Sequence, residues 1–99
     1  MSVRTTEPGL DEIAAVVRPL LPQGYDAFLF GSRAAGRAAP SSDWDIGLLG
    51  PQPLRGAVVE RVREALDELR TLHSFDVVDL ATVPDEFREL ALRHAVKLA

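Results

Sequence analysis

Residues 27–46 read AFLFGSRAAGRAAPSSDWDI, and this stretch decides the fold. Its apolar beginning predicts a buried strand over residues 26–30, which runs into Gly31 and Ser32 at the start of a short helix ending near Ala38. A strand that leads into such a turn directs several backbone N–H groups at one point, where they can hold a phosphate group. The stretch therefore predicts a strand–turn–helix unit with an anion site at its turn.

Acidic residues follow on the next two predicted strands, residues 43–49 and 75–80. Asp43 and Asp45 are two positions apart, so on a strand they project from one face while Trp44 projects from the opposite, apolar face. Two like charges ~4 Å apart repel by about 4 kcal/mol at an effective dielectric constant near 20. Such a cluster is tolerated where a cation neutralises it, so the pattern indicates a metal site.

The strand over residues 75–80 offers two candidates for a third carboxylate, Asp76 and Asp79. Their spacing of three places them on opposite faces of a strand, so only one of them can join Asp43 and Asp45. Each face also carries apolar neighbours, and the alternation by itself leaves the choice open.

Length, charge and composition narrow the class of protein. Ninety-nine residues predict a single domain over residues 1–99, with residues 1–9 flexible. A net charge of −4 and a pI near 5.0 argue against direct nucleic-acid binding. The chain has no cysteine, and His73 and His94 are far apart, so a metal should be a hard cation on oxygen ligands, most simply Mg²⁺. No apolar run has the length of a signal peptide or a membrane span, and we expect a cytoplasmic protein without a membrane partner.

Apolar periodicity predicts three further helices: one begins at Leu10, one covers residues 54–72, and one runs from Asp85 to Leu98. The order of elements is then α-β-α-β-α-β-α. We predict an α/β (α+β) domain with a small mixed sheet of three or four strands. The helices should lie mainly on one face, and the acidic strand ends should form an open cleft on the other.

Phosphate-binding N–H groups beside clustered carboxylates suit chemistry on a nucleoside triphosphate. Transfer of a nucleotidyl group places charge on the α-phosphate and on the departing pyrophosphate. Two metal ions about 3.5–4 Å apart can stabilise both the attacking and the leaving oxygen, and three carboxylates on adjacent strands can hold such a pair.

The pattern of Gly31-Ser32, ten residues, and then Asp43-Trp44-Asp45 resembles the signature of the DNA polymerase β-like nucleotidyltransferase superfamily. The short chain and the spacing to Phe75-Asp76-Val77 resemble its minimal nucleotidyltransferases (MNT family). These are single-domain proteins often found as the antitoxin partner of a HEPN-domain toxin. The resemblance covers about residues 25–98 and implies the nucleotidyltransferase fold.

The resemblance also implies residue roles. Gly31 and Ser32 would contact the β- and γ-phosphates of bound ATP, and Arg33 and Arg37 are candidates to neutralise its charge. One departure is Ala35, which stands where many relatives carry a basic residue.

The carboxylates receive their roles in the same way. Asp43 and Asp45 would hold two Mg²⁺ ions, and Asp76 would complete the metal site and help to deprotonate the attacking hydroxyl. Asp76 is favoured over Asp79 because the family's acid opens this strand.

By resemblance, the protein is a Mg²⁺-dependent nucleotidyltransferase that moves AMP from ATP to a hydroxyl of a protein acceptor. A HEPN-type toxin would be the partner in a hetero-oligomer. The alternative is a non-catalytic antitoxin that neutralises a toxin by binding alone, and the intact carboxylates argue against it. A nucleotidyltransferase acting on small molecules would normally need an added acceptor-binding domain.

Overall fold

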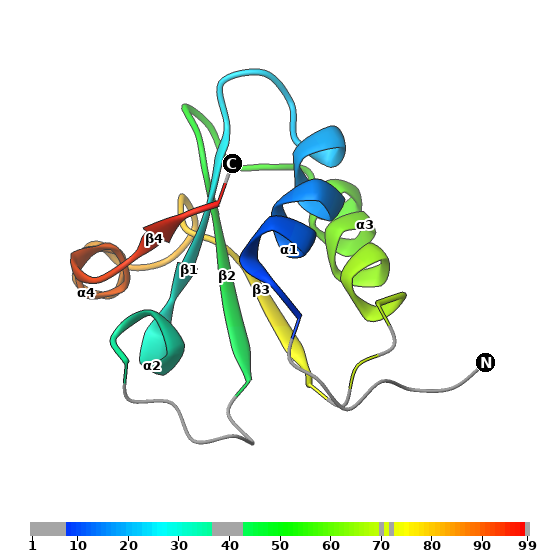
Figure 1. Ribbon diagram of the computed structural model, residues 1–99. Coiled ribbons are helices and arrows are strands. Elements are labelled where there is room, and N and C mark those ends of the chain that lie inside the picture. The colour runs from blue at the N-terminus through cyan, green and yellow to red at the C-terminus, as the bar shows by residue number, and fades with distance from the viewer. Residues whose placement is uncertain (1–7, 37–42, 70, 72, 99) are drawn as a thin grey trace.

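The structure is a computed structural model that describes residues 8–36, 43–69, 71 and 73–98. Its elements are α1 (Leu10–Val17), η1 (Arg18–Leu20), β1 (Asp26–Phe30), α2 (Gly31–Ala34), β2 (Trp44–Leu49), α3 (Gly56–Asp67), β3 (Phe75–Asp79), α4 (Asp85–Arg93) and β4 (Val96–Lys97), shown in Figure 1. The strands form a four-stranded sheet in the order β3-β2-β1-β4. β2 and β3 are parallel and the other pairs antiparallel, so the predicted mixed sheet is confirmed.

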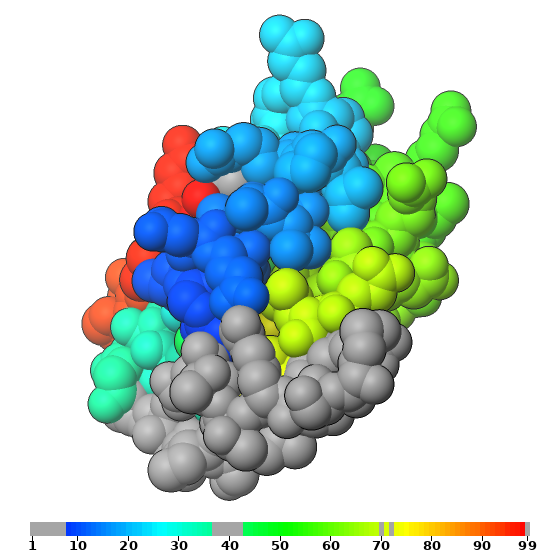
Figure 2. All heavy atoms as spheres, turned by 45° about the vertical axis from the view of Figure 1, so that its right-hand side comes forward, coloured from blue at the N-terminus to red at the C-terminus, as the bar shows by residue number. Residues whose placement is uncertain are grey.

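The main core lies between the sheet and the pair α1 and α3. Alternation along β2 turns Trp44, Ile46 and Leu48 toward this pair, and all three are buried. α1 contributes Ile13 and Val17 to the same core, and α1 and α3 lie side by side on this face (Figures 1 and 2). Full burial of such side chains stabilises the fold by about 1.5–3 kcal/mol each, so this layer fixes the sheet.

The other face of the sheet is covered in part by α4, which corrects the expectation that the helices would lie mainly on one face. Phe30, Leu80 and Ala91 form a second buried cluster there, and α4 lies on the opposite side of the strands from α1 and α3 (Figure 1). Gly47 of β2 allows this close packing, because a Cβ at that position would lie 2.6 Å from Leu80 Cδ1.

The last predicted helix is shorter than expected. It ends at Arg93 instead of Leu98, and the chain continues into β4, which pairs with β1. The N–H of Leu98 donates to the carbonyl of Ala27 at 2.7 Å, so the chain end satisfies backbone groups at an edge of β1 that would otherwise lack partners.

Two other predicted helices are also shorter in the structure than expected. α3 covers the middle of the expected 54–72 helix, and α2 ends at Ala34. The part of the α2 prediction that falls on residues 37–38 lies outside the described residues. So does the flexibility expected for residues 1–7, whereas Pro8 is buried and Gly9 begins α1 as its N-cap. Within the described ranges, no helix is both long and apolar enough to cross a membrane.

Candidate active site

Three predicted carboxylates lie near enough to influence one another electrostatically at one end of β2 and β3. Asp45 and Asp76 are register partners on these parallel neighbouring strands, and Asp43 lies just before β2. Burial raises the pKa of Asp45, and the negative charges of Asp76 and then Asp43 raise it further. The three side chains therefore share one electrostatic environment, with the half-buried Asp45 at its centre.

Gly31 brings the predicted phosphate turn against this acidic group. β1 is antiparallel to β2 and pairs Phe30 with Asp45, so the next residue turns directly beside the Asp45 side chain. Gly31 has a φ of +77°, and a Cβ there would overlap the Asp45 carboxylate. The backbone conformation favours glycine, and a side chain here would force the Asp45 carboxylate to move. Ser32 follows in α2 and is half-buried.

The chemistry of these donors fits a hard divalent cation. Carboxylate oxygens are ligands that Mg²⁺ prefers, and a cation would offset the repulsion that raises the pKa of Asp45. Across the described ranges of the chain, no three acidic or histidine side chains already converge as a metal-binding group. The fit therefore rests on the strand register and on the mutual electrostatic effect of the carboxylates.

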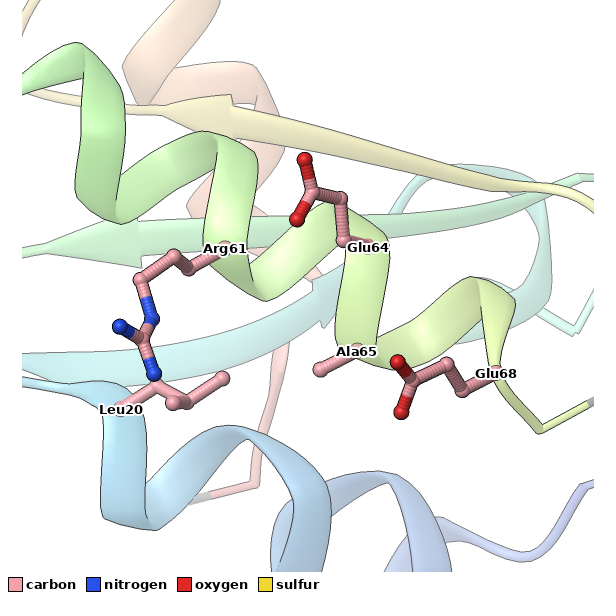
Figure 3. A pocket seen from close by; sticks show the side chains of 5 residues that line it. All are labelled: Leu20, Arg61, Glu64, Ala65 and Glu68. Carbon is pink, nitrogen blue, oxygen red and sulfur yellow. The ribbon is translucent and has the colours of Figure 1, made fainter.

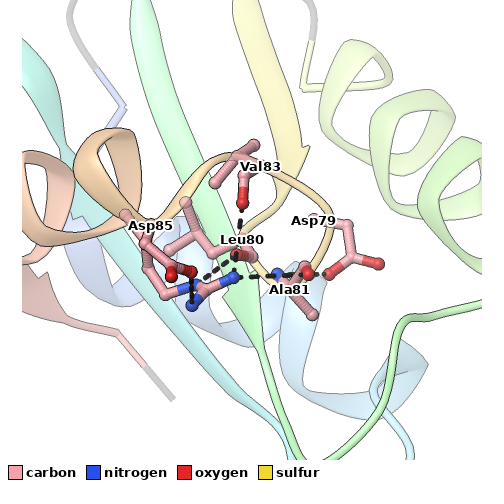
Figure 4. Close-up of polar contacts among 6 residues, drawn as sticks. Asp79, Leu80, Ala81, Val83 and Asp85 are labelled. Carbon is pink, nitrogen blue, oxygen red and sulfur yellow. Dashed lines mark hydrogen bonds and ion pairs between the residues drawn. The ribbon is translucent and has the colours of Figure 1, made fainter.

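Asp79 lies at the other end of β3 from Asp76 and has a structural environment. Its side chain is buried, and its carboxylate accepts hydrogen bonds from the backbone N–H groups of Leu54 at 2.8 Å and Ala81 at 3.0 Å. Figure 4 shows the surroundings of Asp79. Asp76, in contrast, is exposed on the other face of β3. Of the two candidates, the structure places Asp76 beside Asp45 and uses Asp79 to fix the loops that flank α3 and α4.

Arg88 completes that structural cluster and was not singled out from the sequence. Its guanidinium donates to the carbonyls of Leu80 at 2.7 Å, Val83 at 3.3 Å and Ala81 at 3.4 Å, and it pairs with Asp85 at 3.1 Å (Figure 4). The one hint in the sequence is that Arg88 lies about one turn into α4, where a long side chain can reach back to the carbonyls of the preceding turn.

Arg33 lies beside an aromatic group. Its guanidinium is 4.3 Å from the centroid of the Trp44 ring, and Nη2 is 3.3 Å from Nδ1 of His73. Trp44 is buried on the face opposite Asp45, as predicted, and meets the ring of His73 edge-on. Arg33 thus connects α2 to the Trp44 side of β2, and its predicted contact with phosphate remains a prediction. Arg37 lies outside the described residues.

A separate pocket of about 300 Å³ opens between η1 and α3 (Figure 3). It is lined by Leu20, Arg61, Glu64, Ala65 and Glu68, and by none of the predicted site residues. Its cationic and anionic groups come from successive turns of one helix, which is typical of a solvated helix surface.

Comparisons with known proteins agree with this geometry. Residues 25–99 match the family described as polymerase beta nucleotidyltransferase. The chain is 34% identical over 82 residues to a probable protein adenylyltransferase, MntA, of Haemophilus influenzae, covering 80% of this chain and 72% of that protein.

Solved structures share the fold. A crystal structure of a toxin–antitoxin with AMP-PNP superposes with a TM-score of 0.70 at 23% identity, over 93% of this chain and 73% of the other. A tri-AMPylated Shewanella oneidensis HEPN toxin in complex with an MNT antitoxin gives a TM-score of 0.62 at 21% identity, over 91% of this chain and 68% of the other. The family match extends over most of the sequence, including all of β1, β2 and β3, and so the chain belongs to the polymerase beta nucleotidyltransferase family.

Proposed function

We propose that this chain transfers AMP from ATP to a hydroxyl of a partner protein in a reaction that requires Mg²⁺. The observation that carries the proposal is the register of Asp45 with Asp76, next to a glycine turn whose Cα closely approaches the Asp45 carboxylate. This arrangement offers carboxylates for a metal and backbone N–H groups for phosphates at one place on the sheet.

Each group has a defined part in the reaction. The N–H groups of the turn at Gly31 and Ser32 hold the β- and γ-phosphates, while Asp43 and Asp45 hold Mg²⁺. Bound Mg²⁺ supplies positive charge to the triphosphate. The acceptor oxygen attacks the α-phosphorus, the bond from that phosphorus to the bridging oxygen breaks, and pyrophosphate leaves. Asp76 is exposed at the edge of this site and accepts the proton of the attacking hydroxyl.

The donor and acceptor are proposed on the strength of the relatives. One is named a probable protein adenylyltransferase, one was crystallised with AMP-PNP, and one is an MNT antitoxin with a tri-AMPylated HEPN toxin. We therefore propose ATP as the donor, a HEPN toxin as the acceptor and partner, and antitoxin as the biological role.

The test is to incubate the purified chain with a HEPN toxin encoded beside it, ATP and Mg²⁺, and to record the intact mass of the toxin. The proposal predicts the addition of one or more AMP units, prevented by EDTA and by Asp45→Asn. An unchanged mass with a toxin that the chain nevertheless binds and inhibits would favour the non-catalytic antitoxin instead.

A further inference from the structure

One aromatic side chain on the face of the sheet that carries Asp45 is left exposed. Phe87, near the start of α4, has 44% of its surface exposed although it is a large apolar residue. Its ring lies 6.1 Å from the ring of Phe30, with the two planes 82° apart. Phe30 is the register partner of Asp45, so this exposed ring is one side chain away from the acidic group.

Phe30 and Asp45 project from the same face of the sheet. Register partners on antiparallel strands share a face, and a Cβ on Gly47, two residues beyond Asp45, would lie 3.3 Å from Phe30 Cδ1. α4 packs on this face through Ala91. Phe87 therefore stands over the end of β1 that leads into the Gly31 turn, and not over the far end of the sheet.

The other aromatic side chains are less exposed than Phe87, and one of them, the half-buried Phe28, lies on the same face of β1 as Phe30 but farther from Asp45 along the strand. Trp44 and Phe75 are buried toward α1 and α3, and Phe30 is buried under α4. Tyr25 stands at the opposite end of β1, where its hydroxyl donates to the carbonyl of Gln52 at 2.6 Å. Among the described residues, Phe87 is thus the most exposed aromatic side chain, and its ring meets that of Phe30, the register partner of Asp45.

We propose that Phe87 forms the platform on which the nucleobase of the bound nucleoside triphosphate stacks. The inference rests on the proposed nucleotide chemistry. With the phosphates at the Gly31 turn and the α-phosphate at the carboxylates, the nucleoside leaves along the same face of the sheet. The exposed Phe87 ring offers the base an apolar surface there. Stacking on an aromatic ring tolerates any base, so Phe87 adds affinity without selecting adenine.

The test separates the base from the phosphates by comparing two probes, Mg²⁺·ATP and Mg²⁺·tripolyphosphate, which lacks a nucleoside. Binding of each is measured by calorimetry for the wild type, Phe87→Ala, Phe87→Leu and Phe87→Trp. We expect Phe87→Ala to weaken ATP binding by about 5- to 100-fold and to leave tripolyphosphate binding unchanged. Phe87→Leu keeps the packing on Phe30 but removes the ring and should also weaken ATP binding, whereas Phe87→Trp should retain it.

Leu90 provides the matched control, because it lies one turn along α4 and is 62% exposed. Leu90→Ala should leave both affinities unchanged. Equal ATP affinity in the wild type and Phe87→Leu would overturn the platform, and so would an equal loss of both probes. Failure of the wild type to bind either probe would instead contradict the proposed function.

Discussion

Asp45 is the residue whose chemistry the fold changes most clearly. Its pKa is raised from the ordinary 3.8 by burial and by its acidic neighbours, so the folded state holds a proton more readily than the unfolded chain. The ionised carboxylate therefore destabilises the fold. This penalty is absent below the ordinary pKa and develops as the pH rises through the raised pKa.

The first prediction follows from the destabilising effect of the ionised Asp45 carboxylate. Without metal, Asp45→Asn should melt at a higher temperature than the wild type at pH 7, because a neutral amide removes the repulsion. The advantage should shrink as the pH falls toward 3.8. Thermal unfolding between pH 4 and 8 measures it, with the exposed Glu89→Gln as control. A gain that does not depend on pH would contradict the electrostatic cause.

Mutation of Asp76 and mutation of Asp79 should have opposite effects on AMP transfer and on the free energy of unfolding. Asp76 is exposed, so Asp76→Ala should abolish AMP transfer and change the free energy of unfolding by no more than about 0.5 kcal/mol. Asp79→Ala leaves the N–H groups of Leu54 and Ala81 without their acceptor and should cost about 1–3 kcal/mol, while most activity survives in the folded protein. An AMP-transfer assay that shows the reverse would move the catalytic role to Asp79.

Gly31 can be tested against a glycine in a similar conformation. Gly31→Ala and Gly36→Ala both place a side chain at positive φ, +77° and +73°, which costs about 1–2 kcal/mol in each case. Only the Cβ at position 31 overlaps Asp45, since nothing lies within 4 Å of a Cβ at Gly36. Gly31→Ala should therefore lose binding of Mg²⁺·ATP, measured by calorimetry, and Gly36→Ala should keep it. Equal binding by both variants would show that the Gly31 turn is not part of the site.

At the scale of elements, α4 is held by the hydrogen bonds of Arg88. Arg88→Met keeps an unbranched side chain but removes donors to the carbonyls of Leu80 and Val83, and should lower the free energy of unfolding by about 1.5–3 kcal/mol. The exposed Arg93→Met, in the last turn of the same helix, should cost less than 1 kcal/mol. Urea unfolding compares the two, and equal losses would mean that the Arg88 contacts add nothing.

The sequence predicts the three longer strands, because their apolar residues and flanking turns lie within a few residues of each other. The strand at residues 26–30 follows from an apolar run, and the strands at residues 44–49 and 75–79 follow from mixed acidic and apolar residues bounded by turns. β4 does not, because two residues pair with β1 through contacts between distant parts of the chain. Helical spacing puts Phe87 and Leu90 on the same apolar stripe of the last helix as the buried Ala91, but the structure leaves both exposed. Helical spacing shows which residues share a face, but not how much of that face the neighbouring sheet covers.

At the scale of the whole molecule, strand alternation predicted that Asp45, Asp76 and the Gly31 turn would lie near one another, as the register shows, while their roles stay predictions. Strand alternation and strand adjacency determine which side chains meet. The sequence could not assign Asp79, whose role depends on a loop N–H twenty-five residues away. It also could not anticipate that Arg33 would lie over Trp44, because that contact depends on how α2 packs against β2.

The central claim is that the carboxylates at Asp43 and Asp45 form a site for a metal-bound nucleotide. The most direct measurement is the melting temperature of the chain with and without saturating Mg²⁺·ATP, for the wild type and for the double variant Asp43→Asn with Asp45→Asn. A ligand at about 100 times its Kd stabilises the folded state by about 2.7 kcal/mol, so the wild-type melting temperature should rise clearly. The double variant should start higher without ligand and rise little with it. An equal rise in both proteins would contradict the claim and place the nucleotide elsewhere.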